Sequence, residues 1–277
     1  MVLRKGIITI CFLSSSLLFA QGKIDGFYRG QNNGTIVLGL GFEDGKKYFA
    51  GEENGKLDLS RSVFYSSIFG AYGITDNLDV NVTIPYIVSD DNANFQDIAI
   101  YLKYRVAVVS TATGRFEFSM SGGFSTNLTD YDLGGLNDIG QQATVIDSRG
   151  LVHYQWSTGW FATAQSGFSF KSDPTPNSIP FTLKLGRASS NWYYDVYYDF
   201  QHSFGGTDYL GTPRPQDFRA FGVDFHKVGG TVYRPFSDSF GIYASLSYVF
   251  DGRNIFLGAG YGLGAVYNFR SNQSNTK

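Results

Sequence analysis

The C-terminal segment of this 277-residue chain alternates bulky apolar residues with glycine, and this pattern constrains the fold more than any other feature. Side chains of a β-strand point alternately to its two faces, so one face of the segment is apolar and the other carries almost no side-chain bulk. The apolar face holds Ile255, Leu257, Ala259, Tyr261, Leu263, Ala265, Tyr267 and Phe269; the other holds Phe256, Gly258, Gly260, Gly262, Gly264, Val266 and Asn268. Glycines weaken a strand in water, but in a membrane barrel the bulky groups meet lipid and small ones leave room inside. The segment therefore predicts a transmembrane β-barrel, with an amphipathic strand of a secreted β-sandwich as the alternative.

The segment closes with an aromatic residue, which resembles the terminal signal by which bacterial outer-membrane barrels are recognised for assembly. We expect Tyr261, Leu263, Tyr267 and Phe269 to form this signal and the barrel-assembly machinery to be a partner during biogenesis. A tail at 270–277 follows the final aromatic, which is a departure from the usual pattern, and we expect it to be periplasmic.

The first twenty residues have the features of a secretory signal peptide. Arg4 and Lys5 precede an apolar run that ends at Ala20, so we expect residues 1–20 to be removed by cleavage near Ala20. The run is too short for a spanning helix, and the rest of the chain has no stretch of about 18 apolar residues that would form one. The single cysteine, Cys11, lies inside the signal. The mature chain is thus expected to have no disulfide, no thiol chemistry and no zinc–thiolate site.

Composition narrows the class of protein further. Removing Arg4 and Lys5 from the 22 basic side chains leaves about 20 against 24 acidic ones, with no basic cluster, so we expect no nucleic-acid partner. The 25 Phe and 19 Tyr are many for a soluble protein, but the aromatic girdles of a membrane barrel would use them. No linker divides the chain, so one domain in contact with outer-membrane lipid is expected. The oligomeric state is left open.

The mature chain begins with a polar, glycine-rich lead and continues as a series of alternating segments. We expect residues 21–33 to be a periplasmic arm or a short plug, and 34–269 to be an all-β, up-and-down antiparallel barrel of about 12 strands, with 10 or 14 as alternatives. With both ends periplasmic, the short turns near 76, 112, 156, 190 and 238 fall on the periplasmic side. The segments near 50, 91, 133, 175 and 210 fall outside, which agrees with the longer external loops of this class. Only the last external connection, near 252, is short.

One stretch resembles a known family. The run Ala71-Tyr72-Gly73-Ile74-Thr75-Asp76-Asn77-Leu78-Asp79-Val80, continued by Ile84-Pro85-Tyr86, is similar to a turn of the outer-membrane proteins named for the meta-cleavage pathway of phenol degradation. Asp25-Gly26-Phe27 and the strand from Asp97 to Arg105 resemble parts of the same family. The resemblance implies an outer-membrane channel for hydrophobic compounds, similar in style to the long-chain fatty-acid channels. The family's name does not establish phenol as the substrate.

Charged and polar residues in the middle of the expected strands are the candidates for the lumen. They are Asp97, Lys103, Arg105, Glu117, Asp147, Arg149, His153, Lys184, Asp195, Asp199, Asp224 and His226. Two interpretations remain: an ion-paired filling of a narrow barrel, or a gated polar constriction on a solute path. A two-residue turn at Ser189-Ser190 would place Lys184 directly opposite Asp195, whereas a four-residue loop would place Tyr197 there.

No set of residues predicts an enzyme. A histidine and a serine that act together must reach each other, but His202 and Ser203 are adjacent and lie on opposite faces. Asp224 and His226 share a face without a nucleophile, and no metal or cofactor motif occurs. We therefore expect no catalytic residues, no metal and no cofactor. The expected function is a channel for small, hydrophobic molecules; the alternatives are a non-transporting structural or adhesive barrel and, further off, a lipid-modifying enzyme.

Overall fold

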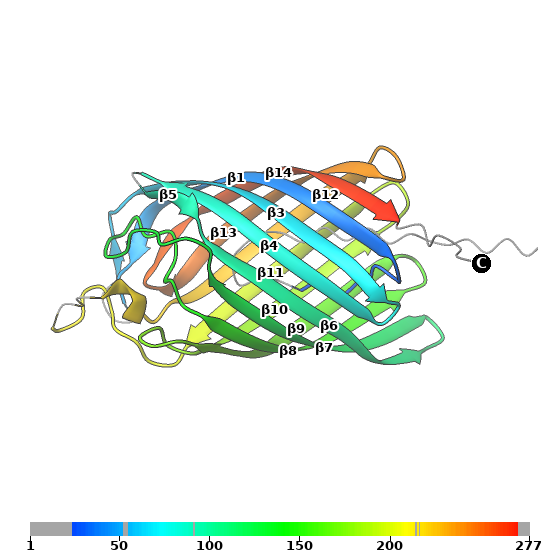
Figure 1. The fold of residues 1–277 in the computed structure, drawn as a ribbon, viewed down its shortest axis with the longest axis horizontal. Helices are drawn as coiled ribbons and strands as arrows, with labels where there is room; N and C mark the ends of the chain where they lie inside the picture. Colours follow the sequence, from blue (N-terminus) through cyan, green and yellow to red (C-terminus); the bar gives the residue numbers. More distant parts are fainter. Residues whose placement is uncertain (1–23, 52–54, 91, 214, 216, 271–277) are drawn as a thin grey trace, which may run out of the picture.

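The computed structural model describes residues 24–51, 55–90, 92–213, 215 and 217–270. In this part of the chain, twelve long antiparallel strands close into one barrel, which confirms the predicted fold class and strand number (Figure 1). The strands are β1 (Asn33–Phe49), β3 (Arg61–Thr75), β4 (Leu78–Ser89), β6 (Asp97–Ser110), β7 (Gly114–Asn127), β8 (Val145–Trp156), β9 (Trp160–Lys171), β10 (Ser178–Ala188), β11 (Tyr193–Ser203), β12 (Asp224–Pro235), β13 (Phe240–Arg253) and β14 (Ile255–Arg270). Two short strands, β2 (Lys56–Leu57) and β5 (Asn92–Phe95), extend the sheet at one end. The predicted signal peptide at 1–20 and residues 271–277 of the predicted tail lie outside the described residues.

Consecutive long strands are neighbours throughout, and pairing of β1 with β14 closes the sheet from Asn33↔Arg270 to Phe49↔Ile255. The start of β1 and the end of β14 lie at the same end of the barrel, together with the short turns (Figure 1). The long loops lie at the opposite end. Barrels of this class have short periplasmic turns and longer external loops, so we name the two ends periplasmic and external.

The described residues contain one helix, the three-residue 3-10 turn η1 (Phe218–Ala220). None of their helices is long and apolar enough to cross a membrane.

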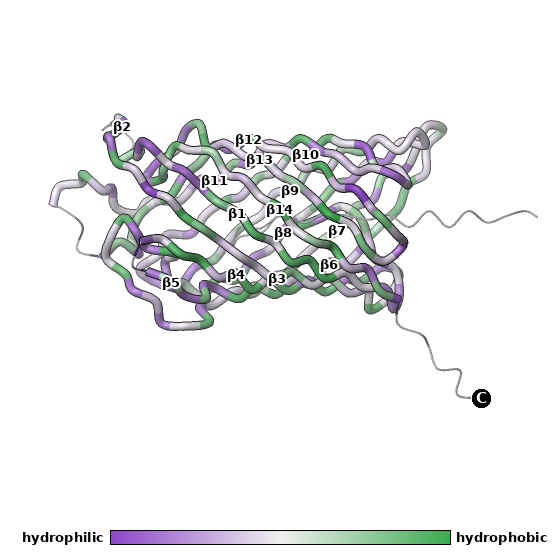
Figure 2. The backbone as a smooth tube through the Cα atoms, turned by 90° about the horizontal axis from the view of Figure 1, so that it is seen from above, coloured by the Kyte–Doolittle hydropathy of each residue, from purple (hydrophilic) through white to green (hydrophobic). Residues whose placement is uncertain are grey.

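Apolar side chains cover the outer face of the barrel. On β14, the exposed side chains are Tyr261, Leu263 and Tyr267, with fractional exposures of 52%, 64% and 40%, while Val266 is buried. On β1, Leu38 and Leu40 are exposed in the same way. Figure 2, in which the backbone is coloured by residue hydropathy, shows the most hydrophilic residues mainly toward the two ends of the barrel. The alternation predicted for the final strand is thus present, with its bulky residues outward.

We expect the change Leu263→Arg to lower the free energy of unfolding by about 2–4 kcal/mol, because it places a cation among lipid chains near the bilayer midplane. Leu263 has the largest exposure of the large apolar residues on β14. Urea unfolding of the protein in lipid vesicles measures the change. Folding of the variant with unchanged stability would contradict the outward orientation of this face.

Glycines on the inner face make room for tyrosine rings from neighbouring strands. A β-carbon at Gly41 would overlap the ring of Tyr65, and one at Gly264 would overlap the ring of Tyr243. The same arrangement recurs where Tyr197 covers Gly229, Tyr233 covers Gly241 and Tyr101 covers Gly123. The Tyr65 hydroxyl donates a hydrogen bond to the Tyr261 carbonyl, 3.2 Å away, which ties β3 to β14 across β1. The small inner face of β14 therefore does not leave an open pore, because aromatic rings fill it.

We expect Gly41→Val to cost about 1–3 kcal/mol of unfolding free energy, since overpacking forces the neighbouring ring off its site. Gly122→Val is the matched control, because a β-carbon at Gly122, on the exposed face of β7, meets nothing within 4 Å. Urea unfolding of both variants in vesicles makes the comparison. Equal stability of the two variants would show that the Tyr65 ring does not need the space.

The turn between β10 and β11 corrects the predicted register. The connection is the four-residue loop Ser189–Trp192, so Ala188 faces Tyr193 and Lys184 faces Tyr197. A two-residue hairpin turn favours residues that accept positive φ, such as asparagine or glycine; here Ser189 instead closes a wider loop, since its backbone N–H donates to the Trp192 carbonyl. The direct Lys184–Asp195 register pair is therefore wrong. The two side chains still share the inner face and form a diagonal ion pair at 3.5 Å.

Candidate functional site: the filled lumen and the external chamber

A segment at the N-terminal side of β1 lies inside the barrel. We call residues 24–32 the lead. Its Asn32 N–H donates to the Gly73 carbonyl near the periplasmic end, 2.9 Å away. Further along, Ile24 exchanges two hydrogen bonds with the side-chain amide of Gln165, at 3.2 and 3.0 Å. The side chains of Ile24, Asp25 and Phe27 are buried. The lead therefore occupies the periplasmic half of the lumen.

Lys103 on β6 anchors the lead. Its ammonium donates to the carbonyls of Asp25 and Phe27, at 2.9 and 2.6 Å, and lies 3.6 Å from the Asp79 carboxylate. Lys103 and Asp79 are each only 1% exposed. Asp79 also contacts the lead directly, because its Oδ2 accepts a hydrogen bond from the backbone N–H of Arg29. A buried charge is tolerated only when paired and hydrogen-bonded, and here the backbone of the lead supplies part of that environment.

Tyr28 and Phe27 of the lead fill the space between the walls. The Tyr28 ring lies 4.0 Å from the Lys103 ammonium and 4.1 Å from the Arg105 guanidinium, a cation–π arrangement on both. Burial raises the pKa of the Tyr28 hydroxyl, which donates to Ser119 Oγ at 2.8 Å. Phe27 packs edge-on against His153, with ring centroids 4.6 Å apart.

Ion pairs fill the remaining periplasmic half. Glu117 lies between Arg105 and Arg115, with 2.8 Å to each guanidinium. Lys184 and Asp195 form the diagonal pair described above. His153 shares a 2.7 Å hydrogen bond with Thr163 and lies beneath Phe27. This half of the lumen is thus closed by the lead and by paired charges together.

The external half of the lumen contains a cavity of about 440 Å³, which we call the chamber. Its walls carry both charged and apolar groups. Lining residues on the strands include Glu43, Arg61, Arg149, Lys171, Asp199 and Lys227, and those on the loops include Leu136, Ile139, Phe218 and Phe221. Two of the wall cations are paired: Lys227 with Asp199 at 3.7 Å and Arg149 with Asp147 at 3.6 Å.

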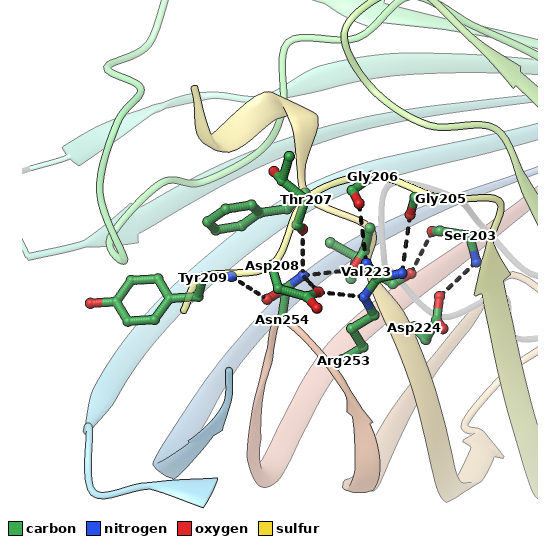
Figure 3. A network of polar contacts seen from close by, with 12 residues as sticks. Ser203, Gly205, Gly206, Thr207, Asp208, Tyr209, Val223, Asp224, Arg253 and Asn254 are labelled. Atoms are coloured by element: carbon green, nitrogen blue, oxygen red, sulfur yellow. Dashed lines mark hydrogen bonds and ion pairs between the residues drawn. The ribbon is translucent and has the colours of Figure 1, made fainter. Parts of the chain in front are cut away.

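The loop 204–223, which the structure describes except for residues 214 and 216, contributes to the chamber, and contacts from Arg253 and Asn254 hold the base of this loop, which we call the roof loop. The Arg253 guanidinium donates to the carbonyls of Gly205 and Gly206, at 3.1 and 3.2 Å, and pairs with Asp208 (Figure 3). Asn254 donates to the carbonyls of Thr207 and Gly222. Asn254 has a φ of 49°, a left-handed conformation that asparagine accepts more readily than most residues. The one-residue connection between β13 and β14 thereby holds the roof loop.

Aromatic and backbone contacts complete the roof. Phe218 stacks on Phe221 with ring centroids 4.7 Å apart. The side-chain amide of Gln141 donates to the carbonyls of Arg219 and Phe221, which joins the roof loop to the loop between β7 and β8. That second loop is held in turn by Tyr131, whose hydroxyl donates to Asp97 at 2.9 Å. Burial and the neighbouring Asp97 carboxylate raise the pKa of Tyr131, which keeps it protonated as a donor.

Most of the predicted lumen candidates point into the barrel. In the periplasmic half the structure brings together Lys103, Arg105, Glu117, His153, Lys184 and Asp195; in or near the chamber it places Asp97, Asp147, Arg149 and Asp199. Among the described residues, no group of three or more His, Cys, Asp and Glu side chains could hold a metal ion.

The prediction that Asp224 and His226 line the lumen is wrong. His226 lies beside the lipid-facing rings of Tyr198 and Phe200, with a 2.7 Å hydrogen bond to Tyr198, and Asp224 pairs with the exposed His202. β12 pairs with β11 without interruption from Tyr233 to Phe225. Odd positions therefore stay inward along the whole strand, and Phe225 is a chamber residue rather than a lipid-facing one.

Several chamber residues were not among the candidates. Lys171 alternates with Phe168 and Phe170, so it lies on the polar face of its expected strand. This alternation could have identified it as a residue of the lumen. Glu43 is the last residue of an alternating run and Arg61 stands just before the next run, so alternation is a weak guide to the direction of either side chain. Phe218 and Phe221 belong to a loop, in which no periodicity indicates direction.

Solved structures with the same fold are outer-membrane proteins. An outer-membrane channel from Pseudomonas putida F1 matches with a TM-score of 0.67 and 13% identity, over 89% of this chain and 100% of that one. The NanC porin matches with a TM-score of 0.53 and 8% identity, over 84% and 98%. The KdgM porin, in complex with disordered oligogalacturonate, matches with a TM-score of 0.52 and 9% identity, over 85% and 99%. At such identities the likeness establishes the fold, that of an outer-membrane barrel.

A comparison with curated protein sequences found no match. A family match, in contrast, covers residues 30–264, which is most of the barrel and includes the turn at 71–80 that carries the predicted resemblance. The chain belongs to the family described as "Putative MetA-pathway of phenol degradation".

Proposed function

We propose that this protein is an outer-membrane channel for small, hydrophobic molecules, with the chamber as the site that receives the solute. The main observation behind this proposal is the cavity of about 440 Å³, which lies beneath the roof loop with its residues Phe218 and Phe221. Ligand sites are commonly cavities of roughly 300–1,000 Å³, lined mainly by apolar and aromatic groups with a few polar ones. The family, and the channel from Pseudomonas putida F1 that shares the fold, support this proposal.

The lead is the gate in this proposal. It separates the chamber from the periplasm, so a solute passes inward only when the lead leaves its place beside Lys103. The contacts that hold it are hydrogen bonds, cation–π contacts and ring packing rather than strand pairing, and the lead can therefore be released without opening the barrel wall.

Solute entry into vesicles tests the function. The vesicles carry lipopolysaccharide in the outer leaflet, because a plain phospholipid bilayer lets small aromatic molecules through. We expect the protein to accelerate entry of ring-labelled benzyl alcohol over protein-free vesicles. Equal rates with and without the protein would overturn the proposal.

A non-transporting structural or adhesive barrel is the second candidate. The filled periplasmic half, with the ion-paired Glu117 and the buried lead, favours it. Removal of the lead distinguishes the two candidates, because a channel without its gate conducts, whereas a barrel closed by its own walls does not.

We also propose a route to the outer membrane. Cleavage near Ala20 releases the mature chain, the barrel-assembly machinery recognises the strand that ends at Phe269, and the barrel then contacts outer-membrane lipid. Transport rather than catalysis is proposed because His153 and His226 are engaged with Thr163 and Tyr198, and His202 lies on the outer face.

A further inference from the structure

Lys171 brings an uncompensated positive charge to the chamber. It is the last residue of β9, it lies on the inward parity with Gln165 and Ser169, and its side chain lines the cavity. Its backbone N–H donates to Asn177, but its ammonium forms no ion pair or hydrogen bond with any described residue. This distinguishes it from Lys103, Lys184 and Lys227, which all have a carboxylate within 4 Å.

Asp147 and Asp224 are engaged with other partners, and neither forms an ion pair with the Lys171 ammonium. Asp147 on β8 already accepts hydrogen bonds from Tyr101 and Ser169 and pairs with Arg149. Asp224 on β12 lies on the outer face, where it pairs with His202 at 3.1 Å. A cation in a partly enclosed site without a partner is unfavourable, and an anionic ligand would complete it.

Three acids line the chamber without an ion pair to a described residue, Glu43, Asp97 and Asp138, and Glu43 stands on the wall opposite Lys171. Glu43 is on β1, six neighbours from β9 in the twelve-stranded barrel. None of the chamber acids is within ion-pair distance of the Lys171 ammonium. The charge of Lys171 is therefore open to a ligand and is not offset across the chamber.

Apolar groups surround this cation. Val145 on β8 faces Lys171 directly in the strand register and is buried. The cavity continues past Ala143 and Phe225 to the stacked rings of Phe218 and Phe221. A ligand held by a charge at Lys171 would thus have its remaining surface against aromatic and aliphatic side chains.

We propose that the chamber binds small amphipathic carboxylates, with the carboxylate on the Lys171 ammonium and an aromatic or aliphatic body beneath the roof loop. This inference rests on the proposed function and names the chemical class of its solute. A charge-assisted hydrogen bond to an ammonium is stronger than a neutral one, so the chamber discriminates the carboxylate from a neutral molecule of the same shape.

Titrations with two matched fluorinated probes test the inference, using the full-length mature protein in detergent micelles. The probes are 4-fluorobenzoate and 4-fluorobenzyl alcohol, and the readout is the ¹⁹F chemical shift and line width. We expect the benzoate to bind more tightly than the alcohol by about tenfold, the ratio that corresponds to a charged hydrogen bond of about 1.4 kcal/mol. Lys171→Gln should reduce this ratio to near one, and Lys171→Arg should preserve it.

Lys46→Gln is the matched control, because Lys46 is an exposed lysine toward the external end of β1, outside the chamber lining. It should leave the ratio unchanged. Heat-modifiable migration on gels reports whether each variant is folded. Equal binding of the two probes, or an unchanged preference in folded Lys171→Gln, overturns the inference. Preferential benzoate binding without any solute entry into vesicles would instead overturn the proposed channel function and leave the binding site standing.

Discussion

Deletion of residues 21–29 is expected to convert a closed barrel into a conducting one. The lead places Ile24, Asp25 and Phe27 in the lumen, all of them buried, and Tyr28 between two cations. Its removal empties the centre of the periplasmic half, while β1, which begins at Asn33, keeps its pairing with β14. Single-channel recordings in planar bilayers should show brief, rare openings for the intact chain and sustained ion current for the deletion variant.

A deletion of 271–277 is the control for this experiment, because it removes a segment of similar length that follows directly after β14 in the sequence. It should leave the current at the level of the intact chain. If the lead-deleted protein folds but does not conduct, side chains of the barrel wall close the lumen by themselves. That result would reject the lead as the gate and favour the structural barrel.

Lys103→Met is expected to give the largest loss of stability among single substitutions. The Lys103 ammonium pairs with the Asp79 carboxylate and donates hydrogen bonds to two carbonyls of the lead, and Lys103 is only 1% exposed. Removing one partner of a buried pair leaves the other charge uncompensated, which costs about 3–5 kcal/mol. Urea unfolding of the protein in vesicles should show this loss, and bilayer recordings should show more frequent openings, since the lead loses its anchor.

The charge explanation has its own control. In Lys103→Met combined with Asp79→Asn, neither member of the pair is charged, so part of the lost stability should return. Lys46→Met, which breaks only an exposed pair with Asp44, should change stability by less than about 1 kcal/mol. If the double variant is as unstable as the sum of the two single ones, the pair is not coupled, and packing rather than charge explains the loss.

The strand register shows how far parity alone can be used. It placed Lys184 and Asp195 on one face correctly, because a residue's face depends only on whether its position is odd or even. Parity did not determine the register of β10 and β11, that is, which residues pair directly, since loops of two and four residues give the same parity. Only the loop from Ser189 to Trp192, closed by its own hydrogen bonds, selects the pairing of Lys184 with Tyr197.

Apolar residues that face the lumen are a second limit on predicting strand orientation from the sequence. Parity assigns Phe225 to the lipid, because aromatic residues usually mark the outer face of a barrel. In the structure it lines the chamber, and Asp224 and His226 are displaced to the outer face as a consequence. An apolar chamber reverses the usual polarity of the two faces, and no single strand carries that information.

The sequence by itself determined that this chain forms a barrel, its strand number and the outward face of most strands, β14 above all. These follow from contact with lipid, which imposes a period of two on every strand independently of its neighbours. Tertiary structure alone decided what fills the lumen. The lead has no periodicity, and its place depends on Lys103, Asp79 and Gln165, which come from three different strands. The charge left open on Lys171 is likewise decided in three dimensions, because whether a cation is paired depends on neighbours that the closed barrel brings together.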